Sequence, residues 1–472
     1  MAVLIEPNNL FEHRIGVAVI GAGACGLTAA LAASEAGAEV VIFERDARPY
    51  GLTGMSTGQI PAAGTRYQRA KGIEDAPEIL AADFMAETRG QTDPDLALAV
   101  ARLSGPTIEW LGERLAMPFE VIDDFTYHGH SRLRMHATPN RNGEELLGAL
   151  VTAVEGVGIP IATQALVEDL VVDREGRVLG LVATRSDGVR EALACDALVL
   201  ACSGFAADRD LVARHCPDVA EAFCFSHPGN TGHALRWGEA LGAKTADLGS
   251  YQAHASIAAA HGVQITWGTM REGGVQVNAL GERFADESRG YSEAAADVLQ
   301  QPGAQAWSIF DERIHHIVSQ VDDYRQAVRA GAVVEAPDVP TLAARLGLPT
   351  APLAATLAEA DALAVDGGTD RFGRHFTPDK RLKAPYRAVK VTAALLHTQG
   401  GLCTDGEGRV LRQDSTPFPN LFAGGGAARG LAGPSGWGYL SGAGLLTAVA
   451  LGAAAGRGAA AISLGVSEEV PA

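Results

Sequence analysis

The chain has 472 residues, of which 47% are hydrophobic and 20% are charged, and its formal net charge is -18. The length allows two or three domains, and the composition excludes a disordered chain. The acidic balance excludes nucleic acid and an anionic membrane surface as partners, because both require clustered basic charge.

The first predicted element is a buried strand over Val17–Ile20 that leads directly into a glycine-rich turn. The turn reads Gly21-x-Gly23-x-x-Gly26 and opens a helix that we expect to end near Gly37, and the next apolar run ends at Glu44. This order is typical of a dinucleotide-binding βαβ unit, in which the pyrophosphate lies on the helix N-terminus. Glu44 then stands where a ribose hydroxyl is held, so FAD or NAD fits and NADP fits poorly.

The middle of the chain continues with elements of both types. Residues 51–65 contain four glycines and several hydroxyls, which predicts irregular backbone beside a planar ligand, too polar for the core. Helical spacing over 76–115 predicts helices, and residues 161–182 predict a hairpin with its turn at 173–176. These segments together favour a mixed α/β fold.

The second half repeats the pattern of strands that end in glycine turns. Residues 197–205 predict a buried strand of this kind, and residues 274–278 continuing into 281–284 predict a second β segment. Residues 337–370 are helical in spacing. A short strand over 420–426 again runs into glycines and precedes an apolar terminal helix. The dinucleotide domain is therefore predicted to be interrupted and resumed.

Cysteine spacing and the chain ends bound the cellular context. The six cysteines show neither CxxC nor haem-attachment spacing, so no metal site is predicted. The N-terminal residues lack the basic segment and apolar core of a signal peptide, so we expect a cytoplasmic protein. The apolar stretch 442–466 is interrupted by Arg457 and rich in glycine, which predicts a buried helix and no transmembrane segment.

In this order, the motifs resemble the flavoprotein family of fumarate reductase and succinate dehydrogenase flavoprotein subunits, 3-ketosteroid dehydrogenases and urocanate reductase. The match covers almost the whole chain. Besides the first glycine turn and Glu44, the motifs that carry the resemblance are Ser56–Thr65, Ala197–Phe205, Asn230–His233, Arg271 before Val277-Asn278, Gly281–Glu287, Phe372–Arg374, His397-Thr-Gln-Gly-Gly401, Leu421–Gly426 and Gly438–Gly444.

The resemblance implies a Rossmann-like FAD-binding domain of the glutathione reductase type, with a central parallel sheet and an inserted α+β capping domain. We expect the FAD-binding domain over 1–245 and 397–472, and the capping domain over 246–396. Succinate dehydrogenase-type subunits attach the flavin through a histidine in the loop that here reads 51–58. This loop has no histidine, so FAD is expected to be noncovalent. His233 stands where the family usually has an acid, which leaves that polar contact open.

The residues expected to contact FAD lie at the glycine turns, in the loop after the second strand and at the start of the last helix. They are Gly21, Gly23, Ala24, Gly26, Glu44, Arg45, Thr53, Ser56, Thr57, Gly58, Ser203, Gly204, Gly425, Gly442, Gly444 and Leu445.

The family moves two hydrogens across a carbon–carbon bond next to a carbonyl or carboxyl, and the protein must stabilise the enolate-like charge. Tyr439 resembles the tyrosine that binds the substrate carbonyl in ketosteroid dehydrogenases, together with an N–H such as that of Gly442 or Gly444. Its alternative role is packing against the isoalloxazine. His397 begins the motif that helps bind a carboxylate in fumarate reductases, and a satisfied core histidine is the alternative.

A proton must also be exchanged. Arg271 lies where fumarate and urocanate reductases use an arginine as proton donor, although it stands one residue nearer to Asn278 than is expected of fumarate reductases. A plain ion pair with Glu272 or Glu287 is the alternative. Ser441 and Tyr251 are weaker candidates for relaying the proton.

The stretch Gly-Tyr-Leu-Ser-Gly at 438–442 stands where fumarate reductases have Asn-Arg-Leu-Gly-Gly. A tyrosine cannot form a bidentate charged clamp, so a C4 dicarboxylate substrate is disfavoured. We therefore expect an FAD-dependent oxidoreductase that acts α,β to a carbonyl, on a cyclic ketone or ketosteroid-like substrate, with an unidentified electron acceptor or donor. The alternatives are a fumarate- or urocanate-type enoate reductase, an electron-transfer flavoprotein subunit of a larger complex, and an NAD-dependent dehydrogenase.

Overall fold

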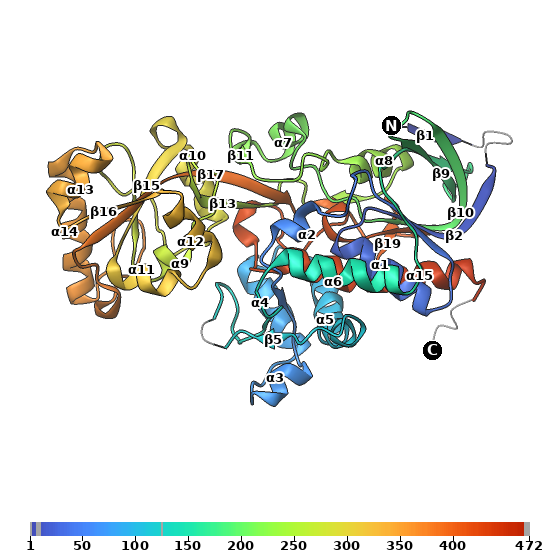
Figure 1. Ribbon diagram of the computed structural model, residues 1–472, viewed down its shortest axis with the longest axis horizontal. Helices are drawn as coiled ribbons and strands as arrows, with labels where there is room; N and C mark the ends of the chain where they lie inside the picture. Colours follow the sequence, from blue (N-terminus) through green and yellow to red (C-terminus); the bar gives the residue numbers. More distant parts are fainter. Residues whose placement is uncertain (1, 6–10, 124–125, 467–472) are drawn as a thin grey trace. The chain divides into compact units, whose positions relative to one another are not determined.

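The computed structural model describes residues 2–5, 11–123 and 126–466, and its chain divides into two compact units (Figure 1). The first unit comprises Met1–Cys216, Ser226–Tyr251 and His397–Ala472, and the second comprises Pro217–Phe225 and Gln252–Leu396. The N-terminal residues 6–10 and the terminal residues 467–472, which the predicted FAD-binding domain includes, lie outside the described ranges. The predicted roles and limits of the two domains stay predictions.

The core of the first unit is a nine-stranded sheet. Its main strand order is β1 (Ala2–Ile5), β8 (Ala165–Val172), β9 (Val178–Arg185), β10 (Arg190–Leu200), β2 (His13–Ile20), β3 (Val40–Phe43) and β7 (Ile161–Ala162), while β20 (Pro417–Ala423) pairs with β10 and β19 (Arg409–Leu411) pairs with β20. Strands β2, β3, β10 and β20 are apolar and pair in parallel, as expected for strands buried on both faces.

The parallel strands end together at one edge of this sheet. Ile20 at the end of β2 is in register with Leu200 at the end of β10, and Leu200 is in register with Ala423 at the end of β20. Each of these strands continues into a glycine-containing turn. The carboxyl edge of the sheet therefore gathers segments that are about 400 residues apart, and open α/β sheets bind their ligands at this edge.

Two helices pack tightly against each other beside the sheet: α1 (Ala24–Glu35) and α15 (Ala443–Ser463) (Figure 1). A Cβ added to Gly456 would overlap with the Ala29 carbonyl oxygen, so glycine is what allows this close approach. Helix α15 is long and apolar enough to cross a membrane, but 67% of its apolar window is buried within the protein. The prediction of a buried terminal helix is confirmed.

The remaining elements of the first unit surround this core. They are α2 (Gly51–Met55), β4 (Ile60–Pro61), α3 (Arg66–Ala70), α4 (Pro77–Glu87), α5 (Pro94–Arg114), β5 (Glu120–Val121), β6 (Met135–Ala137), α6 (Gly143–Gly156), α7 (Arg209–His215), α8 (His233–Leu241), β12 (Thr245–Ala246), β18 (Gly401–Leu402) and the 3-10 turns η4 (Gly425–Ala427) and η5 (Gly436–Gly438). The predicted helices over 76–115 and the predicted hairpin are confirmed.

The segment 51–65 differs from its prediction as an irregular polar loop. It forms the short helix α2 and the strand β4, and Thr53, Ile60 and Ala63 within it are buried. The Ser56 hydroxyl donates to the Thr53 carbonyl at 2.7 Å. This side-chain hydrogen bond occupies a carbonyl that the next turn of a longer helix would bind.

The second unit is built on a six-stranded sheet with helices around it. Its strands run in the order β11 (Phe223–Cys224), β17 (Tyr386–Thr398), β15 (Gln305–Asp311) and β14 (Val275–Val277), with β13 (Tyr251–Ala258) and β16 (Val333–Ala336) also paired to β17. Its helices are α9 (Gly268–Arg271), α10 (Glu293–Leu299), α11 (Glu312–Val318), α12 (Asp322–Arg329), α13 (Val339–Leu346) and α14 (Thr350–Asp366), with 3-10 turns η1 (Pro217–Val219), η2 (Pro302–Ala304) and η3 (Pro378–Lys380).

The predicted continuation of the β segment into 281–284 is wrong. Strand β14 ends at Val277, and Asn278 then forms a turn in which its Oδ1 accepts the N–H of Leu280 at 3.0 Å. Beyond the turn, Arg283 enters a buried ion-pair network with Glu287 and Asp370. The charged motif that looked like a second strand is therefore an ionic cross-link.

Candidate active site

The first glycine turn is shaped by contacts with neighbouring backbone. Gly21 has a φ of +106°, and a Cβ there would lie 2.5 Å from the Ala201 carbonyl oxygen. A Cβ on Gly26 would overlap with the Gly21 carbonyl oxygen. At Gly23, by contrast, a Cβ would meet only the Thr53 hydroxyl, at 3.5 Å, so this glycine faces open space. The turn therefore leaves room for a group beside Gly23 at the start of α1.

The Glu44 carboxylate is fixed next to this turn. Its Oε2 accepts the N–H of Ala22 at 2.9 Å, its Oε1 accepts the N–H of Asp46 at 3.0 Å, and the side chain is only 8% exposed. Because each carboxylate oxygen can accept a second hydrogen bond, the carboxylate keeps capacity for ribose hydroxyls. The adjacent Arg45 is exposed and donates to the Gly229 carbonyl at 3.0 Å.

The hydroxyl side chains of the loop after β3 order the backbone around the helix start. The Thr53 hydroxyl accepts the N–H of Ala24 at 2.9 Å, and the Ser56 hydroxyl accepts the N–H of Gly58 at 3.1 Å. Thr57 is exposed. Gly23, the N-cap of α1, supplies no capping side chain. The helix N-terminus is thereby suited to an anion such as a pyrophosphate.

Two further turns meet the first one at the carboxyl edge of the sheet. Ser203 has a φ of +66°, and a Cβ on Gly426 would lie 2.8 Å from the Gly204 nitrogen. Gly425 has a φ of +56°, and the neighbouring Gly424 lies close to Cys25 of α1. Backbone from three strands thus forms one surface without large side chains, and this arrangement fits a dinucleotide.

The structure brings His397, Tyr439 and the start of α15 together within the first unit. The His397 and Tyr439 rings lie 5.6 Å apart between centroids, at an angle of 73°. A Cβ on Gly444 would be 3.2 Å from Nε2 of His397 and 3.5 Å from the Tyr439 hydroxyl. The two polar side chains therefore approach the same turn of α15, whose N-cap Gly442 has a φ of +80° and supplies no capping side chain. Leu445, in this first turn, is half-buried.

His397 is an uncharged donor or acceptor at neutral pH. Burial lowers the pKa of its imidazole to about 4, and a hydrogen bond with the Thr398 backbone opposes this shift only in part. Tyr439 is 8% exposed. The pair therefore offers polar atoms without a formal charge, next to a helix N-terminus that favours negative charge.

Two side chains that the sequence reasoning missed support this cluster. Gln399 is buried, and its Nε2 donates to Nδ1 of His397 at 2.8 Å. His130 donates from Nε2 to the Ser441 carbonyl oxygen at 2.9 Å, and burial lowers its pKa to about 4. Gln399 lies within the motif 397–401 that the sequence had already indicated, so its role beside His397 could have been inferred from sequence. His130 lies 311 residues from Ser441, and no sequence pattern connects them.

Tyr251 and His233 also lie in the first unit. Tyr251 is buried, and a Cβ on Gly436 would overlap with its ring, so it packs directly on backbone. His233 begins α8, its Nδ1 lies 3.0 Å from the Thr231 hydroxyl, and burial lowers its pKa to about 4. The residue that replaces the family's usual acid is thus uncharged at neutral pH.

Arg271 belongs to the second unit, where it is the last residue of α9. Its side chain is exposed. The surrounding protein removes part of the hydration of the guanidinium and so lowers its pKa, while the charge of Glu272 opposes this shift. The carboxylate of Glu287 is already bound by Arg283 and Arg374. Of the two alternative acidic partners, Glu272 is the one whose charge raises the pKa of Arg271.

His254, also in the second unit, is a buried polar residue that the sequence reasoning missed. It is 2% exposed, its ring stacks on Tyr291 with centroids 4.9 Å apart, and its Nδ1 accepts the N–H of Ser256 at 3.1 Å. Burial lowers its pKa to about 3. Its place within the apolar strand β13 was the available signal.

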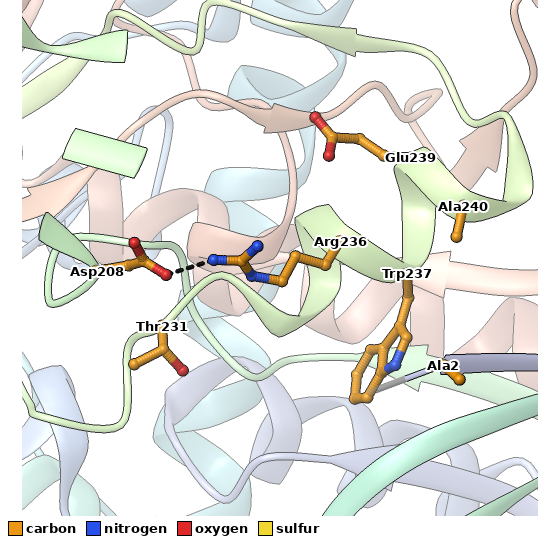
Figure 2. A pocket seen from close by; sticks show the side chains of 7 residues that line it. All are labelled: Ala2, Asp208, Thr231, Arg236, Trp237, Glu239 and Ala240. Carbon is orange, nitrogen blue, oxygen red and sulfur yellow. Dashed lines mark hydrogen bonds and ion pairs between the residues drawn. The ribbon is translucent and has the colours of Figure 1, made fainter. Parts of the chain in front are cut away.

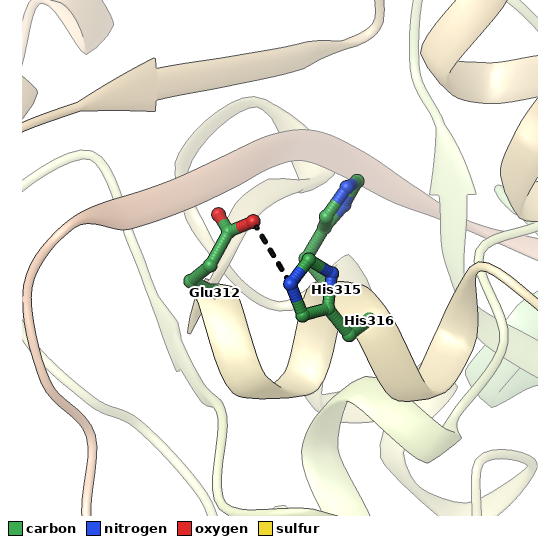
Figure 3. A group of neighbouring side chains, drawn as sticks. All are labelled: Glu312, His315 and His316. Atoms are coloured by element: carbon green, nitrogen blue, oxygen red, sulfur yellow. Dashed lines mark ion pairs between the residues drawn. The ribbon is translucent and has the colours of Figure 1, made fainter.

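Two other features lie apart from the predicted residues. Figure 2 shows a hollow of about 600 Å³ lined by Ala2, Asp208, Thr231, Arg236, Trp237, Glu239 and Ala240, in which Arg236 points at Asp208 and pairs with it at 2.5 Å. Figure 3 shows Glu312, His315 and His316 on α11, a group whose ligand atoms lie within 4.8 Å of one another. Arg387 pairs with Glu312 at 2.7 Å, and this positive charge opposes a cation there.

Comparison with known proteins identifies the family. The sequence profile of a family described as "FAD binding domain" matches residues 16–445. The chain belongs to this family. It is therefore an FAD-binding oxidoreductase with a mixed α/β flavoprotein fold, as the motifs predicted.

The relatives include reductases and dehydrogenases. A probable fumarate reductase, Ifc3, of Shewanella frigidimarina (strain NCIMB 400) is 30% identical over 94% of this chain and 74% of its own length. A 4-oxocyclohexanecarboxylate 2-dehydrogenase of Sinomonas cyclohexanicum is 26% identical over 87% of each chain. The solved 3-ketosteroid-Δ4-(5α)-dehydrogenase from Rhodococcus jostii RHA1, in complex with 4-androstene-3,17-dione, superposes with a TM-score of 0.77 at 25% identity, covering 96% of this chain and 98% of that one.

Proposed function

We propose that the protein dehydrogenates or reduces the carbon–carbon bond α,β to the carbonyl group of a cyclic ketone. The observation that carries this proposal is the approach of Tyr439 and His397 to the first turn of α15. These donors are uncharged, and the segment 438–442 contains no arginine. Such a site suits a neutral carbonyl oxygen that gains negative charge during the reaction better than it suits a second carboxylate.

Bound FAD supplies hydride exchange at the flavin N5 atom. The glycine turns and Glu44 would hold its nucleotide half. The Tyr439 hydroxyl would donate a hydrogen bond to the substrate carbonyl oxygen, with N–H groups at the start of α15, and would stabilise the enolate-like charge. Ser441, whose carbonyl is held by His130, remains a weaker candidate for proton relay.

The activities for which two similar proteins are named favour a ketone. The Sinomonas relative is named as a dehydrogenase of 4-oxocyclohexanecarboxylate, and the Rhodococcus structure holds a steroid dione. Both of these compounds carry a carbonyl group on a saturated or partly unsaturated ring.

The substitution Tyr439→Phe tests the proposal. The variant should keep the flavin spectrum and lose about 10²-fold in turnover of a cyclic enone or cyclohexanone, because it lacks one donor to the developing oxyanion. Stopped-flow measurement of flavin reduction or reoxidation reads this directly. Tyr67→Phe, which removes a hydroxyl elsewhere in the first unit, is the control and should retain full turnover. Unchanged turnover in Tyr439→Phe would remove Tyr439 from the mechanism.

The second candidate is an enoate reductase, which the similarity to a fumarate reductase and the presence of Arg271 and His397 favour. Arg271 would then exchange the proton. Assaying the reduced enzyme against matched enones and enoates separates the candidates, because the preferred class reoxidises the flavin faster. Loss of enoate turnover in Arg271→Gln, with flavin retained, would support this candidate.

We also propose that the flavin is noncovalent and that the protein works in a reducing, cytoplasmic compartment. The segment 51–58 has no histidine, and Cys25, Cys195, Cys202 and Cys403 are free thiols. Acid precipitation should therefore leave the flavin in the supernatant. Purification with a coloured haem or iron–sulfur partner would instead support the electron-transfer subunit, and a colourless protein that binds nicotinamide would support the NAD-dependent alternative.

A further inference from the structure

Gln399 lies beside His397 at the candidate active site. The Gln399 side chain is 5% exposed, and its Nε2 is 2.8 Å from Nδ1 of His397. In this orientation of the amide, Oε1 is buried without a hydrogen-bond partner among the described residues, and Nε2 can only donate, so Nδ1 is the acceptor. The single proton of the neutral imidazole then sits on Nε2.

Backbone hydrogen bonds fix the main chain at Gln399, and a glycine leaves room for its side-chain amide. The backbone N–H of Gln399 donates to the Ser250 carbonyl at 2.8 Å, and the backbone carbonyl of Gln399 accepts the N–H of Gly430 at 2.7 Å. A Cβ on Gly430 would lie 2.6 Å from Oε1 of Gln399. The missing side chain at Gly430 therefore provides the space that the amide occupies next to the imidazole.

The other ring nitrogen of His397 faces the proposed carbonyl site. Nε2 and the Tyr439 hydroxyl both lie near Gly444 in the first turn of α15. A proton on Nε2 makes this nitrogen a donor toward a substrate oxygen, whereas the opposite tautomer would present a lone pair and repel that oxygen. The side chain at position 399 thus decides whether Nε2 of His397 attracts or repels the substrate oxygen.

We propose that Gln399 is a positioning residue that fixes His397 in the Nε2–H tautomer, so that the imidazole donates a hydrogen bond to the substrate carbonyl oxygen. The inference rests on the proposed function for the substrate, whereas the tautomer is a property of the protein alone. Burial keeps the imidazole uncharged by lowering its pKa to about 4. Tyr439 is the titratable side chain whose ring contacts the His397 imidazole, and the Gln399 amide adds no charge.

Nitrogen-15 NMR of the FAD-loaded, histidine-labelled protein reads the tautomer, with His397→Gln used to assign the signals. We expect an unprotonated Nδ1 and a protonated Nε2, without change from about pH 8 to about pH 5.5. A protonated Nδ1 in the wild-type protein would overturn the proposal.

Two substitutions test the role of the amide. In Gln399→Leu, Nδ1 loses its donor, so both tautomers should be populated and kcat should fall by about tenfold, with KM changed less. In Gln399→Glu, a carboxylate accepts from Nδ1–H, so the pKa of His397 should rise and a new ionisation should appear in the pH–rate profile. The control is Gln413→Glu, which adds the same charge in the same unit. The Gln413 side chain donates to the Ala243 carbonyl, and its substitution should change neither the pKa of His397 nor kcat.

The outcomes separate this proposal from the proposed function. An unchanged tautomer and an unchanged kcat in Gln399→Leu, in an enzyme that turns over ketones, would remove the positioning role and leave the proposed function intact. If no ketone is turned over, the proposed function fails, and the NMR comparison of the wild-type protein with Gln399→Leu still decides whether Gln399 sets the tautomer.

Discussion

The Glu44 carboxylate accepts the N–H of Ala22, within the nucleotide turn, and the N–H of Asp46, just after β3. One side chain therefore orders the backbone of the turn and remains available to a ribose. Its position roughly 20 residues after the first glycine predicted the ribose contact, but the two backbone bonds became visible only in the structure.

At this scale we predict that Glu44→Gln weakens FAD binding. The amide retains one acceptor, while its NH₂ group faces the second backbone N–H, so one bond is lost and two donors oppose each other. FAD affinity should fall by about tenfold to a hundredfold, measured by fluorescence titration of protein stripped of flavin. The exposed Glu39→Gln is the matched control, and equal affinity in the two variants would contradict the role of Glu44.

At the scale of elements, the strand–turn–helix unit depends on glycines that do different work. Gly26 allows the turn to fold back on itself, because a Cβ there would overlap with the Gly21 carbonyl oxygen. Gly23 has a φ of -83°, which any residue adopts, and a Cβ there would meet only the Thr53 hydroxyl. Gly26 therefore serves packing, and the open space beside Gly23 is where we propose that the cofactor lies.

This difference predicts opposite outcomes for two alanine substitutions. Gly26→Ala should lower the free energy of unfolding by about 1–3 kcal/mol through overpacking. Gly23→Ala should leave that free energy nearly unchanged and weaken FAD binding by at least about tenfold, because its methyl group occupies the space beside the helix N-terminus. Denaturant unfolding of the apoprotein and FAD titration measure the two effects. Wild-type FAD affinity in Gly23→Ala would show that the cofactor does not approach this turn.

For the whole molecule, buried imidazoles couple stability to pH. Burial lowers the pKa of His130, His136 and His397 to about 4 and that of His254 to about 3. Below about pH 6.5 the unfolded chain binds protons that the folded chain does not, so stability falls as the pH falls toward these values. Glu287, whose pKa is lowered by Arg374 and Arg283 against the effect of burial, contributes stability above its unfolded value of 4.5 that is lost as the pH falls through its lower folded value.

We therefore predict that the melting temperature of the FAD-loaded protein falls steadily between about pH 6.5 and about pH 4. Calorimetry across this range measures the slope. His254→Phe removes one of the protonations and should flatten the slope, whereas His261→Phe, at an exposed position, should leave it unchanged. A melting temperature that is constant across the range would show that these imidazoles titrate alike in the folded and unfolded chain.

The sequence by itself determined the α/β class, the βαβ unit and the buried terminal helix, because these follow from local order: apolar periodicity, glycine spacing and one acid at a set distance. The FAD-binding family was predicted from the resemblance of the motifs taken in order. The sequence also singled out His397 and Tyr439, since each lies in a recognisable motif.

Only the tertiary structure decided how these residues are supported. Gln399 faces His397, and His130 reaches Ser441, because strand ends and loops distant in the chain meet at one edge of the sheet. The charged segment after β14 became an ionic cross-link for the same reason, since the partner Asp370 lies 87 residues from Arg283. Local sequence patterns contain no information on which distant side chain fills a given space, and packing supplies it.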